Sequence, residues 1–121
     1  MTVDVELPST TAAPARARGA LEELAERISA ERLRDVRLLV SELVTNAVRH
    51  AGGEVVRLVV GVREGILRVE VHDPGDGFEV AAPSEDPMRA SGWGLVLVDE
   101  LADRWGVDRA PTTRVWFEMR A

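Results

Sequence analysis

The chain has 121 residues, 45% of them hydrophobic, which is enough for one domain with a substantial core. It has no cysteine, which excludes disulfides and zinc–thiolate sites, and all fifteen of its cations are arginines, which excludes lysine-dependent chemistry. The net charge of −6 argues against binding to nucleic acid. The N-terminus does not resemble a signal peptide and no apolar run reaches about 20 residues, so we expect a soluble cytoplasmic protein that does not bind membranes.

The first third of the chain predicts a strand and a helix. Residues 3–7 alternate apolar and acidic side chains, as a half-buried strand does, and Pro8 ends the alternation. Pro14, followed by apolar residues three and four apart, predicts a helix over about 12–29.

A second helix is predicted over about 31–51, where Gly52 and Gly53 close it. Its apolar residues recur three and four positions apart and predict one buried stripe. The stripe consists of Leu33, Val36, Val40, Leu43, Val44 and Ala47.

A hairpin and a long loop follow. Residues 55–62 and 66–72 are rich in branched side chains and predict two strands, joined by a turn at 63–65. Residues 73–91 contain Gly, Pro, Asp and Ser with little periodicity and predict a loop, and loops of this length are usually functional.

The C-terminal part predicts a helix over 94–104 and two strands over 105–108 and 114–119. Short connections between most strands favour a mixed, mostly antiparallel sheet with the helices on one face. The fold class expected for the single domain, 1–121, is therefore an α/β two-layer sandwich.

Glu42 and Asn46 form the first motif that carries chemistry. Counted at about 100° per residue, they share a flank of the second predicted helix, away from the buried stripe. Asparagine is unfavourable inside a helix, because its amide competes for backbone hydrogen bonds. From the helix alone, an ordinary solvated face explains both residues. Leu38 and Leu39 also lie outside the stripe, where they are candidates for a partner-facing or dimer-facing surface.

The second motif is Asp73-Pro-Gly-Asp-Gly, directly after a predicted strand. It has the composition of an ordinary turn capped by aspartate. However, Gly75 and Gly77 also allow the backbone to approach a flat ligand closely.

The third motif is Gly92-Trp-Gly-Leu95, which opens a predicted helix. Exposed amides at a helix start attract anions, and Gly92 and Gly94 let phosphate oxygens reach them. Arg89 precedes the motif and is the only cation in the loop, so it is either a phosphate contact or a solvated side chain.

In this order and spacing, the three motifs resemble the N, G1 and G2 boxes of the GHKL ATPase superfamily. The layout is most similar to small anti-sigma-factor serine/threonine kinases of bacteria. The resemblance covers almost the whole chain and implies the Bergerat-type ATP-binding fold. It also implies that residues 78–90 form the lid over ATP.

The resemblance implies a role for each matching residue. Asn46 would ligate Mg²⁺, and Glu42 would act beside the γ-phosphate as catalytic base. Asp73 would accept a hydrogen bond from the adenine amino group, supported through water by Thr113 in the last strand. The glycine motifs, with Leu95, would line the nucleotide site.

The resemblance also implies partners. Characterised members dimerise, hold a sigma factor and phosphorylate a serine of an anti-anti-sigma protein of the STAS type. A nucleotide-gated binding module that transfers no phosphate is the alternative, because the predicted lid is short and contains one arginine, Arg89.

Overall fold

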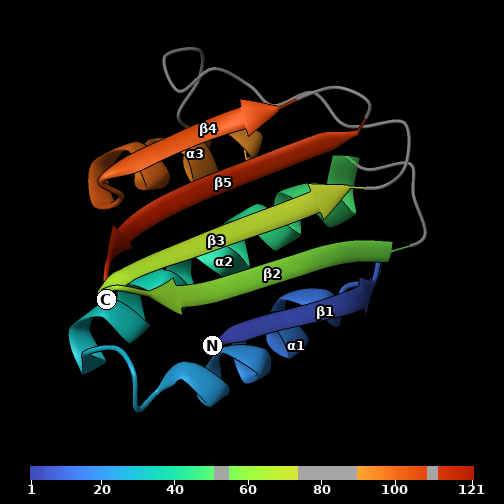
Figure 1. Cartoon of the computed structure of the whole chain (residues 1–121). Coiled ribbons are helices and arrows are strands. Elements are labelled where there is room, and N and C mark those ends of the chain that lie inside the picture. Colours follow the sequence, from blue (N-terminus) through green and yellow to red (C-terminus); the bar gives the residue numbers. More distant parts are fainter. Residues whose placement is uncertain (51–54, 74–89, 109–111) are drawn as a thin grey trace.

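A computed structural model describes residues 1–50, 55–73, 90–108 and 112–121 (Figure 1). Residues 74–89 lie outside the described part of the chain; they include Gly75, Gly77, Arg89 and all but the last residue of the lid predicted over 78–90. The elements in chain order are β1 (Thr2–Pro8), α1 (Ala13–Ala20), the 3₁₀ helix η1 (Leu21–Leu24), α2 (Ala30–His50), β2 (Val55–Arg63), β3 (Ile66–Asp73), α3 (Ala90–Leu101), β4 (Arg104–Asp108) and β5 (Thr113–Arg120).

The five strands form one sheet in the order β1-β2-β3-β5-β4, and the helices cover one of its faces (Figure 1). This confirms the predicted two-layer sandwich. The expectation of a mixed sheet was wrong, because all four ladders among the described strands are antiparallel. β4 runs parallel to β3, but β5 lies between them, so the two never pair.

The β2–β3 hairpin has a two-residue turn, since Arg63 pairs with Ile66. Glu64 and Gly65 both have positive φ, at 54° and 79°. Two positive φ values are the requirement of a type I′ turn, whose twist matches that of the strands, and glycine adopts this conformation without strain.

Alternation along the strands places apolar side chains toward the helices. β3 and β5 show the pattern most clearly, with every second residue buried from Leu67 to Asp73 and from Thr113 to Met119. The strongly buried side chains of the two layers form one core. It is centred on Val36, Leu39, Val40, Val44, Val56, Leu58, Val60, Leu67, Val69, Val71, Val98, Val115 and Phe117.

The helix predicted over 12–29 is in fact two short pieces, α1 and η1. Gly19, which is unfavourable inside a helix, lies where α1 ends. The three-residue period of a 3₁₀ helix then places Leu21 and Leu24 on one side, and both are buried. Pro14 lies in the first turn of α1, as predicted.

The start of α2 agrees with the prediction to within one residue. The Ser29 hydroxyl caps it by accepting a hydrogen bond from the Arg32 backbone N–H at 3.1 Å. α2 packs against α1, α3 and the sheet strands β2 and β3, so it is the central helix of its layer.

The third helix begins and ends earlier than the prediction of 94–104. It begins at Ala90 and ends at Leu101, because Arg104 already pairs with Glu118 in the sheet. The Trp105 indole donates a hydrogen bond to Asp99 at 2.9 Å, which fastens the edge strand β4 to α3.

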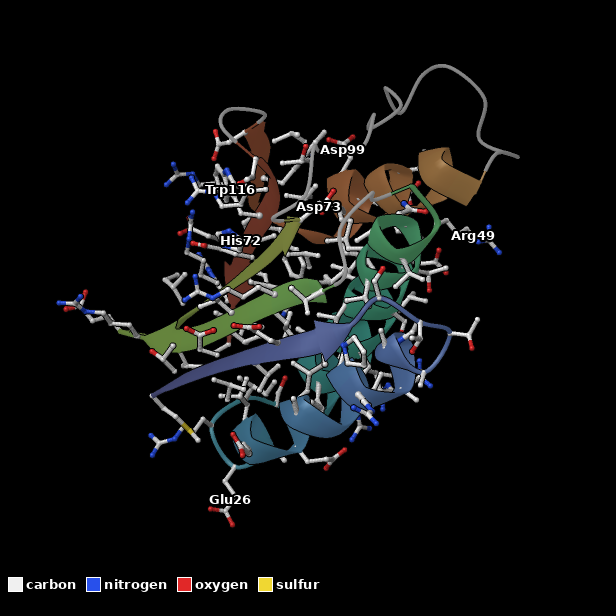
Figure 2. All side chains as sticks on the ribbon, turned by 90° about the vertical axis from the view of Figure 1, so that its right-hand side faces the viewer. Glu26, Arg49, His72, Asp73, Asp99 and Trp116 are labelled. Carbon is white, nitrogen blue, oxygen red and sulfur yellow. The ribbon has the colours of Figure 1, made fainter. Side chains whose placement is uncertain are left out.

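Charged side chains occupy the sheet face opposite the helices. His72 and Trp116 project from this open face (Figure 2). The Arg68 guanidinium lies 4.4 Å from the Trp116 ring centroid and donates hydrogen bonds to Glu70 and Glu118. Burial opposes ionisation of Glu70, but hydrogen bonds from Arg68 and His72 outweigh it and hold its pKa below the ordinary value.

Candidate nucleotide site

The candidate site lies at one end of two inner strands of the sheet, where β3 ends and β5 begins. Asp73 is the last residue of β3 and pairs directly with Thr113, the first residue of β5. Asp73 is fully buried and Thr113 is 3% exposed. Figure 2 shows that Asp73 lies on the helix side of the sheet, near α3. The strand alternation therefore directs a carboxylate into the space between the two layers.

The last turns of α2 reach the same end of these strands (Figure 1). Asn46 lies in this part of α2 and is 5% exposed, so the solvated-face interpretation is wrong for this residue. Glu42, one turn earlier, is half-buried and so remains accessible from solvent. Asp73 and Thr113 are thus paired in the sheet, whereas Asn46 and Glu42 lie one turn apart in α2, the helix that packs against β3.

The flank of α2 that carries Asn46 is buried because α2 packs between α1 and α3. Its buried surface is consequently wider than the one apolar stripe that periodicity predicts. Leu39 is fully buried for the same reason, and its assignment to a partner-facing surface was wrong. Leu38, in contrast, is 44% exposed.

The third motif lies in the first two turns of α3. Because the helix begins at Ala90, Gly92 and Gly94 are inside it rather than before it, and Leu95 follows in the same helix. The first amides of an α-helix have no partner within the helix and can bind an anion.

Sequence reasoning did not single out an ion-pair cluster on the open face behind Asp73 and Thr113. His72 and Arg114 are cross-strand partners that immediately adjoin the site pair. His72 Nε2 lies 2.8 Å from a Glu70 oxygen, and Arg114 Nη1 lies 3.7 Å from the same atom. Arg114 also pairs with Asp108 of β4. The available signal was the strand itself, because successive residues of a strand point to opposite faces and His72 therefore lies on the face away from Asp73.

The described geometry comprises a buried carboxylate paired with a hydroxyl, a buried amide on a helix, and a more accessible carboxylate one turn away. Buried carboxylates discriminate between hydrogen-bond donors and acceptors on a ligand. Amide oxygens and carboxylates also suit hard cations and proton transfer. An open antiparallel sheet with helices on one face is the architecture that the resemblance to the GHKL superfamily implies.

Comparison with known proteins agrees with the resemblance found in the sequence. The chain matches the family described as the histidine kinase-like ATPase domain over residues 7–119. The chain belongs to this family.

The chain is also similar to proteins named serine-protein kinase RsbW. It is 29% identical to that of Oceanobacillus iheyensis, in an alignment that covers 84% of this chain and 75% of the relative. It is 28% identical to that of Staphylococcus aureus over 95 residues, which cover 65% of this chain and 60% of the relative. The sensor histidine kinase LiaS of Bacillus subtilis is 32% identical, over 56% of this chain and 18% of its own length.

Among solved structures, the chain resembles the RsbU and RsbW domains of Rv1364c from Mycobacterium tuberculosis. The TM-score is 0.77 at 21% identity, over 99% of this chain and 32% of that one. This similarity supports the fold. In the part of the chain that the structure describes, no helix is long and apolar enough to cross a membrane.

Proposed function

We propose that this chain is a Mg²⁺- and ATP-dependent serine/threonine protein kinase of the anti-sigma-factor type, which phosphorylates an anti-anti-sigma protein with a STAS-type fold. The observation that carries the proposal is that two polar side chains in packed elements are buried, Asp73 as the last residue of β3 and Asn46 in the last turns of α2, with half-buried Glu42 one turn from Asn46. The relatives named serine-protein kinase RsbW support the same activity.

Asp73 selects the base in this proposal. Its carboxylate accepts a hydrogen bond from the exocyclic amine of adenine, where guanine would present a carbonyl. Thr113, directly across the ladder, supports the carboxylate through a bridging water. Gly75 and Gly77 follow Asp73 in sequence and shape the surface beneath the base.

Asn46 is the proposed protein ligand of Mg²⁺. Among the described residues, no three His, Cys, Asp or Glu side chains are grouped as a metal site. This fits Mg²⁺, which usually binds through one or two protein oxygens while nucleotide phosphates and waters complete its shell. When bound, the ion neutralises charge on the phosphates.

Glu42 is the proposed catalytic base. Its carboxylate accepts the proton of the acceptor serine hydroxyl, the oxygen attacks the γ-phosphorus, and ADP departs as the bond to the β-phosphate oxygen breaks. A half-buried position suits this role, because the acceptor protein must reach the carboxylate. The unpaired amides of the first turn of α3, which includes Gly92, hold the phosphates together with Arg89, and Gly94 lies in the next turn.

The second candidate is a nucleotide-gated module that binds its partner without phosphoryl transfer. It is favoured by the segment 78–90, which is short and contains Arg89 as its one cation. A sparse set of cations would leave the γ-phosphate with fewer contacts in the transition state.

The proposal is tested by measuring transfer of radiolabelled γ-phosphate to a purified STAS-type protein. The assay is repeated with a form of that protein in which the acceptor serine is replaced by alanine. Glu42→Gln should lower the rate by about 10²-fold or more, the scale of a lost general base. Glu31→Gln is the matched control, since Glu31 is exposed at the start of the same helix. Equal rates for Glu42→Gln and the wild type would remove Glu42 from catalysis. Partner binding without any transfer would favour the module.

The proposed assembly is a homodimer that also holds a sigma factor. Light scattering of the purified chain, alone and with a sigma factor, measures both properties. A monomer at every concentration would contradict the dimer.

A further inference from the structure

Three large hydrophobic side chains are exposed among the described residues. They are Met1 at 48%, Leu38 at 44% and Ile66 at 41%. Met1 and Ile66 both belong to the sheet layer, where the Met1 carbonyl accepts a hydrogen bond from Val62 and Ile66 begins β3. Leu38 is therefore the one of the three that lies on the helical layer. A single exposed leucine is ordinary, so its neighbours decide its significance.

Leu38 lies in a row along the outer surface of α2, which we name the α2 ridge: Arg34, Leu38, Glu42, Thr45 and Arg49. Spacings of three and four residues put these side chains on one face of the helix. Arg34, Leu38 and Arg49 are exposed, and Glu42 and Thr45 are half-buried. Figure 2 shows that Arg49 points away from the sheet.

The ridge carries positive charge at both ends. Within the described part of the chain, no ion pair is found for Arg34 or Arg49. Arg32 and Arg37 of the same helix, in contrast, pair with Asp35 and Glu22. At 1.5 Å per residue, the two ridge arginines are about 22 Å apart along the helix, with Leu38 and Glu42 between them. Two cations that form no ion pair with the other described residues favour an acidic partner.

We propose that the α2 ridge is the docking surface for the protein that carries the acceptor hydroxyl. The inference rests on the proposed kinase function, because it places that partner over the proposed base. An apolar patch of the partner covers Leu38, and carboxylates at its margins face Arg34 and Arg49. Leu38 and Glu42 are about 6 Å apart along the helix, so a serine beside the apolar patch reaches the Glu42 carboxylate.

A second copy of this chain is excluded as the occupant by the same geometry. Any molecule that covers Leu38 also approaches Glu42, one turn away. A permanent dimer contact there would keep the acceptor serine from the base. The partner must therefore bind and leave, which fits a surface with one apolar side chain and a charged margin.

The test uses a purified STAS-type anti-anti-sigma protein as the probe and measures its Kd for the ATP-loaded chain. Leu38→Glu should raise the Kd and the KM for the probe about tenfold or more, with the Kd for Mg-ATP unchanged. Ile66→Glu is the matched control, because Ile66 is almost equally exposed but belongs to the sheet layer. It should leave all three constants unchanged.

The charge part of the proposal has its own readout. The double substitution Arg34→Glu with Arg49→Glu should slow association with the probe and flatten its dependence on salt concentration. An unchanged salt dependence would overturn the charge complementarity.

Other outcomes separate the docking surface from the kinase function. Undiminished probe binding by Leu38→Glu, a loss in Ile66→Glu instead, or no binding by the wild type would overturn the docking surface. Conversion of a dimer to a monomer by Leu38→Glu would overturn it too, in favour of a dimer interface. Binding that depends on Leu38 but yields no phosphorylated serine would refute the kinase function and leave the docking surface in place.

Discussion

Asp73 and Thr113 face each other across the β3–β5 ladder, and both are buried at the end of these strands where the candidate site lies. Directly opposed residues in an antiparallel pair have β-carbons about 4.5–5.5 Å apart. The pairing of the strands therefore fixes the hydroxyl beside the carboxylate before any ligand binds. Such preorganisation reduces the cost of ordering the site on binding.

Thr113→Val should weaken ATP binding about tenfold, which corresponds to about 1.4 kcal/mol, the scale of one hydrogen bond to a charged group. Valine keeps the shape and the strand preference of threonine, so the fold should be retained. Calorimetric titration with ATP measures the effect, and the melting temperature provides the control. An unchanged Kd would mean that Thr113 is only a strand residue.

Asn46→Ala should remove the Mg²⁺ dependence of ATP affinity. The wild type should bind ATP more tightly with Mg²⁺ than with a chelator present, whereas the variant should bind equally in both. Because Asn46 is buried, thermal unfolding must first show that the variant folds. Should the variant retain the full response to Mg²⁺, the ion would have other ligands.

Gly106→Val should destabilise the edge of the sheet. A β-carbon at Gly106 would lie 2.8 Å from Nε1 of Trp116, so the indole ring must shift. Overpacking of this kind costs about 1–3 kcal/mol. Urea denaturation measures the loss, and near-ultraviolet circular dichroism reports the tryptophan environment.

Gly19→Ala is the companion substitution. Among the described residues, no atom outside the glycine's chain neighbours and its own helix backbone lies within 4 Å of a β-carbon placed there, so alanine should stabilise the end of α1 by about 0.5–1 kcal/mol. Equal effects of the two glycine substitutions would contradict the packing of Trp116 against Gly106.

Periodicity predicted much of the fold correctly. The strand predicted over 66–72 is β3, and the predicted apolar stripe of α2 is buried apart from Leu33, which is partly buried. The break between α1 and η1 was not predicted, because the same apolar spacing suits an α-helix and a 3₁₀ turn. Leu39 was misplaced because the position of α3 beside α2 depends on tertiary packing, which the pattern of one helix does not contain.

The roles of the candidate site residues stay predictions. Asn46, Asp73 and Thr113 were selected from motifs and from the resemblance, and in the structure all three are buried. The direct pairing of Asp73 with Thr113 was not predicted, because strand register depends on contacts between residues 40 positions apart. The same reason applies to the pair that Glu70 of β3 forms with Arg114 of β5.

Asp73→Asn tests the central claim, adenine recognition by a buried carboxylate, most directly. The substitution keeps the shape of the side chain but replaces an acceptor oxygen with a donor amide, which opposes the donor on adenine. Calorimetry should show that the wild type binds ATP and ADP but not GTP, and that the variant, still folded, loses adenine nucleotide affinity by at least about 10²-fold. A folded variant that binds ATP as tightly as the wild type would contradict the placement of the base pocket at Asp73.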